Sequence, residues 1–171
     1  ISKPMKSRTS CSRLSPYFAW GNLSTRYVWQ LANNEVSRGK SRFHLNSFTS
    51  RLRWQAHFIQ KFEMESDIEF RSINKGFEKF KKKVNNKFIS AWKKGETGIP
   101  IVDAGMREMN ETGWMHNRLR MITAMFLSKN LLINWQEGEK YFMENLVDGD
   151  IASNNGGWQW SASTGTDAAP Y

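Results

Sequence analysis

Apolar residues recur at steps of three or four along most of the chain, which is the spacing of one buried face of an α-helix. Segments with this spacing cover residues 25–31, 47–65, 74–87, 100–113, 114–132 and 135–147. Pro16, Ser24 and Pro100 are typical of helix starts, and Gly113 is typical of a helix end. No segment alternates apolar and polar residues as a half-buried strand does. The pattern therefore predicts an all-α domain without repeats or linkers.

The segment 74–87 is a basic amphipathic stretch, with Phe77, Phe80 and Val84 expected to face inward. Its lysines could contact nucleic-acid phosphates, or they could form an ordinary solvated helix face. The pattern favours the solvated face, and the better candidates for phosphate contacts are Arg118, Lys93 and Lys94.

The last segment, DGDIASNNGGWQWSASTGTDAAPY (148–171), has almost no aliphatic residues and is predicted to be a polar loop. Trp158 and Trp160 stand out in it because their neighbours offer little apolar surface. We expect them to face other elements or a flat ligand. Gly156 and Gly157 would let the backbone come close to a planar group.

A mixed polar face on the helix expected over 114–132 indicates a pocket wall rather than a core. Asn117, Arg120 and Met121 share this face. Asp148 and Asp150, separated by one glycine, can supply a carboxylate for Arg120 while the other carboxylate faces a ligand. These residues alone predict a ring-binding pocket that contains arginine and aspartate.

Composition narrows the class of protein further. Lys and Arg number 25 against 16 Asp and Glu, and the net charge of +9 favours a polyanionic partner or an anionic cofactor. A single cysteine, Cys11, excludes an internal disulfide and a cysteine-based zinc site, and indicates a reducing compartment. No apolar run approaches the roughly 20 residues of a membrane span. The first residues resemble neither a signal peptide nor a natural start, which predicts a piece of a longer chain.

Several motifs resemble the photolyase and cryptochrome family: SRLSPYFAWGNLSTRYVW, TGIPIVDAGMREMNETGWMHNRLRM, NWQEGEKYF and the whole 148–171 segment. The resemblance runs from about Ser12 to Tyr171 and implies the helical FAD-binding domain. Residues 1–171 would then be a partial FAD-binding domain, truncated at both ends and without the family's N-terminal α/β antenna domain. We expect these residues alone to retain FAD weakly.

The resemblance also implies which residues bind FAD. Ser12, Arg13, Leu14 and Ser15 would hold its phosphates, as suits a serine-rich turn before a helix. The remaining FAD-binding positions are Gln55, Asn117, Arg120, Asp148, Asp150 and Asn154. Arg120 would pair with Asp148, and Asn154 would lie beside the flavin N5, where plant cryptochromes carry an aspartate.

A second set of positions matches the residues of the family that carry electrons and bind the lesion. Trp158, Trp135 and Trp92 would relay an electron from the surface, with Trp158 nearest the flavin and Trp92 exposed. The positions for the flipped pyrimidine dimer and its DNA are Trp54, Trp160, Met121 and Arg118. Two positions depart from the pattern, since Arg51 stands where many dimer-repairing relatives have Glu, and Gln55 where they have Arg.

The implied function is light-driven repair of DNA that contains pyrimidine dimers, with FAD as cofactor and no metal, by a cytoplasmic monomer. The alternatives are a cryptochrome-like photoreceptor, a hydrolase that uses Asp148 and Asp150, and a piece that is inactive alone. Asn154, Trp54 and Trp160 argue for repair over signalling. Two carboxylates on one turn argue against a hydrolase, because glycosidase carboxylates face each other across a cleft.

Overall fold

The computed structural model describes residues 11–79 and 85–165, and within these ranges every regular element is helical. The α-helices are α2 (Ser15–Ala19), α3 (Thr25–Ser37), α4 (Arg42–Met64), α5 (Asn86–Lys94), α6 (Pro100–Thr112), α7 (Asn117–Met125), α8 (Trp135–Asn145) and α9 (Ile151–Ala162). Shorter turns are η2 (Ser66–Glu69), η3 (Lys75–Phe77) and η4 (Phe126–Asn130), the last of π type. The all-α prediction is confirmed.

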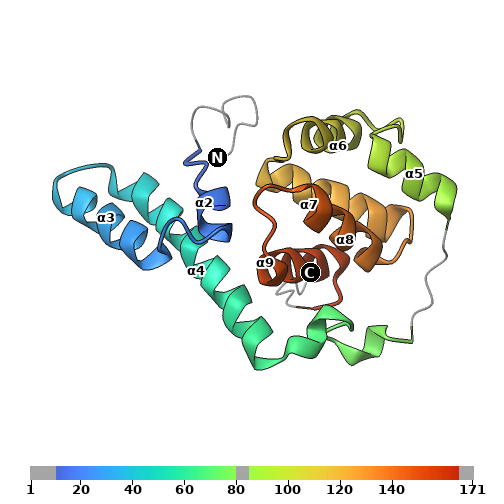
Figure 1. Cartoon of the computed structure of the whole chain (residues 1–171), viewed down its shortest axis with the longest axis horizontal. Helices are drawn as coiled ribbons and strands as arrows, with labels where there is room; N and C mark the ends of the chain where they lie inside the picture. Colours follow the sequence, from blue (N-terminus) through green and yellow to red (C-terminus); the bar gives the residue numbers. More distant parts are fainter. Residues whose placement is uncertain (1–10, 80–84, 166–171) are drawn as a thin grey trace.

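The helices form two groups on either side of α9 (Figure 1). On one side α3 packs against the long helix α4, and on the other α5 packs against α6, which packs against α7. α9 lies between the groups, in contact with α4, α7 and α8. The main core belongs to the second group and consists of Ile89, Trp92, Val102, Met106, Met109, Met115, Ala124, Leu127, Ile133, Trp135, Phe142, Leu146, Trp158 and Ala162.

The helix-start and helix-end signals that the sequence predicted are confirmed, and their caps show why. Two helices are longer than predicted, since α3 continues to Ser37 and α4 begins at Arg42. The Oγ of Ser24 accepts a hydrogen bond from the backbone N–H of Tyr27 at the start of α3. Pro16 lies in the first turn of α2 and Pro100 in that of α6. Gly113 ends α6 in the left-handed region, with φ 66°.

The largest difference from the sequence-based prediction is at the end of the chain, where α9 replaces the predicted polar loop. Asp150 caps the helix, and most of its side chains between Ala152 and Ala162 are buried or half-buried. A helix enclosed by three neighbours needs no polar face, so it lacks the helical spacing of apolar residues that identified the others. Its small residues allow these neighbours to come close.

The single helix predicted over 74–87 is not found in the described residues: 74–79 contain only the short turn η3, and α5 begins at Asn86. Asn74 caps the short turn η3, and Asn85 caps α5 by accepting a hydrogen bond from the N–H of Phe88. Asparagine side chains that bond nearby backbone N–H groups compete with a continuous helix. Phe77 is exposed rather than inward, while Phe80 and Val84 lie outside the described residues.

The helix predicted over 114–132 begins later and changes type before it ends. His116 accepts a hydrogen bond from the N–H of Arg118 and starts α7 at Asn117. The backbone passes into the π-turn η4 after Met125. Within the described ranges, no helix has the length and apolar content that crossing a membrane requires.

Candidate functional site

A cavity of about 430 Å³ opens between α4, α7 and α9, with the α8–α9 connection along one side. Pockets for cofactors and other small molecules typically hold roughly 300–1,000 Å³. The lining residues are Arg51, Trp54, Gln55, Phe58, Asn117, Arg120, Met121, Ala124, Phe142, Leu146, Asp148, Gly149, Asp150, Ser153, Asn154, Gly157, Trp158, Trp160 and Ser161. The structure therefore brings the predicted ring-binding side chains of three helices to one place.

Arg120 and Asp148 form the ion pair that the sequence predicted. Nη2 of Arg120 lies 2.9 Å from each carboxylate oxygen of Asp148, and its Nε donates to the carbonyl of Met115 at 2.8 Å. The Asp148 side chain is 4% exposed and that of Arg120 is 26% exposed. Because a buried carboxylate needs a fixed partner, this pair ties α7 to the α8–α9 connection and orients the guanidinium along the cavity.

Asp150 both caps α9 and lines the cavity. Its Oδ1 accepts a hydrogen bond of 2.8 Å from the N–H of Ser153. A carboxylate at a helix N-terminus is stabilised by the helix dipole. The Oγ of Ser153 is buried against the same cavity and has no hydrogen-bond partner in the described part of the chain, so it is available to a bound molecule.

Asn154, the position expected beside the flavin, is held through its amide nitrogen. Nδ2 donates to the backbone carbonyl of Glu139 at 2.9 Å. The amide oxygen is left without a protein donor among the described residues. Asn154 therefore brings an acceptor to the cavity lining, which suits an N–H group of a ligand.

A second polar layer lies behind Asn154, on the side of α9 that faces η2. Nδ2 of Asn155 donates to the Glu139 carboxylate at 2.8 Å and to the carbonyl of Ile68 at 3.0 Å, and Gln159 also donates to that carbonyl. Burial raises the pKa of Glu139 to about 7. The hydrogen bond from Asn155 lowers this pKa, and the negative charge of Glu69 raises it further. This network anchors α9 without entering the cavity.

Aromatic side chains border the exposed part of the cavity. Trp54 on α4 is 49% exposed, and Trp160 on α9 is half-buried. Met121 lies in the same lining, and Nδ2 of Asn117 lies 3.9 Å from its sulfur. The two tryptophans predicted to flank a flipped pyrimidine dimer thus both line this cavity.

The adjacent glycines of α9 have different surroundings. A Cβ at Gly156 would overlap the ring of Phe58, so the flat group that approaches this glycine is a side chain of α4. A Cβ at Gly157 would meet no atom within 4 Å. Gly157 lines the cavity, and open space above its backbone is available to a ligand.

The predicted arrangement of the tryptophan relay needs correction. Trp92, expected at the surface, is 0% exposed because α5 buries it in the core, where its Nε1 donates to the carbonyl of Thr123. Its ring lies 6.0 Å from that of Trp158, centroid to centroid. The order of the three tryptophans in the relay stays a prediction. Trp135 is also buried, at 3%, and the described residues show no ring contact for it.

Two predicted groups lie outside the lining. Residues 12–15 run into the short helix α2, and the guanidinium of Arg13 lies over the Trp114 ring at 5.3 Å from its centroid. Arg118 is exposed in the first turn of α7. The phosphate-binding role of residues 12–15 and the DNA-binding role of Arg118 stay predictions.

Sequence reasoning missed several lining residues. Phe58 follows Trp54 by four positions on α4, so helical spacing could have placed it in the site. Ser153 and Phe142 carried no such signal, since one lay in a segment predicted as loop and the other fitted the core pattern. Glu139, which supports Asn154 from behind, belonged to a helix with no visible link to the 148–171 segment.

The cavity suits a flat heterocycle with polar edges. Ala124 and Leu146 provide apolar surface, the Oγ of Ser153 and the Oδ1 of Asn154 have no hydrogen-bond partner among the described residues, and the backbone at Gly157 leaves room for a ring. The fold and the cavity therefore define a helical cofactor-binding domain.

Comparison with known proteins identifies the cofactor and the family. The family model for the FAD binding domain of DNA photolyase matches residues 48–171. The deoxyribodipyrimidine photo-lyase of Buchnera aphidicola is 48% identical over 166 residues, which cover 94% of this chain and 34% of that protein. That of Vibrio cholerae is 45% identical over 168 residues, covering 96% and 35%. The chain belongs to the DNA photolyase family, whose cofactor is FAD, and spans about a third of the length of these relatives.

Solved structures show the same fold. The crystal structure of a bacterial class III photolyase from Agrobacterium tumefaciens matches with a TM-score of 0.90 at 40% identity, over 95% of this chain and 34% of that one. A cryptochrome from Synechocystis matches with a TM-score of 0.87 at 34% identity, over 94% and 33%.

Proposed function

We propose that this chain carries the catalytic site of a FAD-dependent enzyme that uses blue light to split cyclobutane pyrimidine dimers in DNA. The observation that carries the proposal is one cavity that combines two kinds of site. Its buried part holds the Arg120–Asp148 pair beside Asn154, and its exposed part holds Trp54 and Trp160. The relatives named deoxyribodipyrimidine photo-lyase support this reading.

Arg120, Asp150, Ser153 and Asn154 would hold the ring of FAD. Bound FAD, in its reduced form, supplies the electron that blue light makes available to the dimer. The ion pair keeps the guanidinium in one orientation, and the Asn154 oxygen accepts a hydrogen bond from a ring N–H. An amide in this position cannot donate a proton to the ring as a carboxylic acid would, which favours repair over protonation of the ring.

Trp54 and Trp160 would bind the lesion. A dimer flipped out of the helix exposes two flat faces, and stacking on indoles offsets part of the cost of unstacking, which is about a few kcal/mol. Met121 would contact the dimer from α7. The net charge of +9 favours contact with DNA phosphates. We propose that the protein does this work as a monomer in the cytoplasm.

The test is a repair assay with FAD-loaded protein and oligothymidine that has been irradiated with ultraviolet light. Blue light in the presence of a reductant should convert the dimers back to thymines, measured by chromatography, and a dark sample is the control. The proposal fails if the protein holds FAD and binds the oligonucleotide yet leaves the dimers intact in the light.

The second candidate is a cryptochrome-like photoreceptor. Arg51 and Gln55, which differ from many dimer-repairing relatives, both line the cavity and would face the substrate. A light-driven change in the flavin spectrum together with unchanged dimers in the same assay would favour this candidate.

A further inference from the structure

We propose that a groove between α3 and α4 binds one free nucleotide, with its phosphate between Arg26 and Arg53 and its base on Trp29. The groove has a volume of about 380 Å³, and its lining consists of Thr25, Arg26, Trp29, Gln30, Leu52 and Arg53. Pockets for small molecules typically hold roughly 300–1,000 Å³. None of these residues lines the cavity between α4, α7 and α9, so the groove is a separate site.

The groove and the larger cavity lie on different sides of α4. Successive residues of an α-helix point about 100° apart around its axis, so Leu52 and Arg53 face the groove while Arg51 and Gln55 face the cavity. Leu52 is 6% exposed and closes the groove at depth with apolar surface. A DNA strand with a lesion beside Trp54 would have to turn around α4 to reach this groove, which favours a free nucleotide as the occupant.

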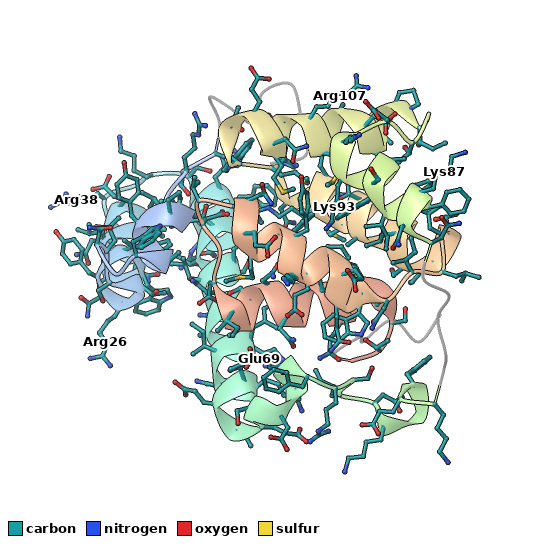
Figure 2. All side chains as sticks on the ribbon, turned by 45° about the vertical axis from the view of Figure 1, so that its right-hand side comes forward. Arg26, Arg38, Glu69, Lys87, Lys93 and Arg107 are labelled. Atoms are coloured by element: carbon teal, nitrogen blue, oxygen red, sulfur yellow. The ribbon has the colours of Figure 1, made fainter. Side chains whose placement is uncertain are left out.

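The two guanidinium groups of the groove have no acidic partner. Arg26 and Arg53 form no hydrogen bond and no ion pair with any other residue that the structure describes. Residues 25–64 contain seven Arg and Lys against two Glu, and one of these, Glu35, is paired with Arg38. Figure 2 shows the Arg26 side chain extending outward from α3, away from α5 and α6. A phosphate that accepts hydrogen bonds from both guanidiniums would offset their mutual repulsion.

The indole of Trp29 is available for stacking. It is 39% exposed, and within the described ranges no aromatic ring contacts it and no Arg or Lys lies over it. Every base has a flat π-face that can stack on an indole. The side-chain amide of Gln30 is also unpaired among the described residues, and it offers a donor and an acceptor to the edge of a base.

The combination of groups favours a nucleotide over a simple anion. Phosphate or sulfate would use the guanidiniums alone, whereas a nucleotide also uses the indole, the amide and the apolar surface of Leu52. The lining comes from two helices, and α3 buries only Val28 and Ala32 among its own residues. A bound nucleotide would therefore tie α3 to α4 and stabilise the folded protein by mass action.

The test is isothermal titration calorimetry of the FAD-loaded protein in the dark, with adenosine 5′-monophosphate and inorganic phosphate as separate probes. Bound FAD keeps the probes out of the larger cavity. Arg26→Gln and Arg53→Gln should each weaken the binding of both probes by roughly 10-fold or more, because charge-assisted hydrogen bonds are lost. The control is Arg38→Gln, at the other end of α3 and outside the groove, which should leave both affinities unchanged.

Trp29→Leu separates the base from the phosphate. It should weaken the binding of adenosine 5′-monophosphate by roughly 10-fold and leave that of inorganic phosphate unchanged, since only the nucleotide can stack. Tyr27→Leu is the control, because Tyr27 lies on α3 outside the groove and is 55% exposed. The inference is overturned if the unaltered protein binds neither probe, if it binds both equally well, or if Arg38→Gln weakens binding as much as Arg53→Gln.

Oligothymidine that has not been irradiated distinguishes a DNA strand from a free nucleotide. Trp29→Leu should leave its affinity unchanged, and a loss as large as that for the mononucleotide would overturn the assignment to a free nucleotide. Dimer repair at saturating oligonucleotide should be the same in Arg53→Gln as in the unaltered protein, and its loss with FAD retained would contradict a separate site. Failure of repair in the unaltered protein overturns the proposed function alone, because nucleotide binding is measured without light.

Discussion

Nη2 of Arg120 lies 2.9 Å from both carboxylate oxygens of Asp148, and the Asp148 side chain is 4% exposed. Arg120→Ala would leave this carboxylate buried without its partner. We expect a loss of about 3–5 kcal/mol in the free energy of unfolding, because an unpaired buried charge keeps its desolvation cost. Urea denaturation measures the loss, and absorbance of the purified protein measures FAD content.

A double variant separates stability from cofactor binding at the same pair. Arg120→Met with Asp148→Leu removes both charges and should recover most of the stability lost by Arg120→Ala. FAD retention should not recover, because the guanidinium that orients the ring is gone. Full FAD retention in the double variant would show that the pair serves the fold alone.

Gly156 and Gly157 offer a matched comparison on one helix. Gly157→Ala should stabilise the protein by roughly 0.5–1 kcal/mol, since a Cβ there meets no atom and alanine favours the helix. Gly156→Ala should destabilise it by about 1–3 kcal/mol, because its Cβ would overlap the Phe58 ring. Thermal unfolding measures both effects. Similar changes in the two variants would contradict the close packing of α4 on α9.

Glu139 makes stability depend on pH. Burial raises its pKa from 4.5 to about 7, so between these values the folded chain holds a proton that the unfolded chain has lost. The free energy of unfolding should therefore fall as the pH rises from about 4.5 to about 7. One pKa unit is worth about 1.4 kcal/mol, and partial exposure reduces the total to about 2 kcal/mol.

Glu139→Gln tests this dependence and keeps an acceptor for Asn155. The variant should lose the pH-dependent fall and should be more stable than the unaltered protein at pH 8, while the two should differ little at pH 4. Urea denaturation at several pH values gives the comparison. An unchanged slope in the variant would assign the pH dependence to another group.

Trp54 is expected to bind DNA without holding the cofactor. Trp54→Ala should weaken binding to irradiated oligothymidine by roughly 5- to 150-fold, since stacking on one indole contributes about 1–3 kcal/mol per base. FAD content should stay the same. Trp29→Ala is the control, because Trp29 lies on α3 outside the cavity lining and is 39% exposed. Fluorescence anisotropy at one fixed salt concentration measures both variants, and equal effects would remove Trp54 from the substrate site.

Local sequence was sufficient for several features of the fold. Ser24, Pro100 and Gly113 mark helix boundaries because each acts on the turn in which it lies. The Ser24 hydroxyl accepts a hydrogen bond at the start of α3. The ring of Pro100 restricts φ at the start of α6, and Gly113 adopts the left-handed φ that ends this helix. A guanidinium on a mixed face requires a carboxylate nearby, which predicted that Asp148 or Asp150 would pair with Arg120, and the resemblance implied Asp148. The residue types alone therefore predicted the chemistry of the cavity.

The geometry of the cavity could not be predicted in the same way. The partners of Asn155 and Gln159 include the carbonyl of Ile68, which is 87 and 91 positions away, so no local pattern reveals them. The exposure of Trp92 depends on how α5 packs against the rest of the core. Helical spacing shows that a residue faces inward and gives no information about which ring it meets there.

Residues 148–171 show most clearly what the sequence alone determines and what only the tertiary structure decides. Their side chains alone identified a polar site with indoles and a carboxylate pair. Only the structure shows that α9 is a helix: α4, α7 and α8 contact it and most of its side chains are buried or half-buried, so no polar face gives it a helical pattern in the sequence. Residue chemistry is a property of the chain, whereas burial and distance arise only when distant segments pack together.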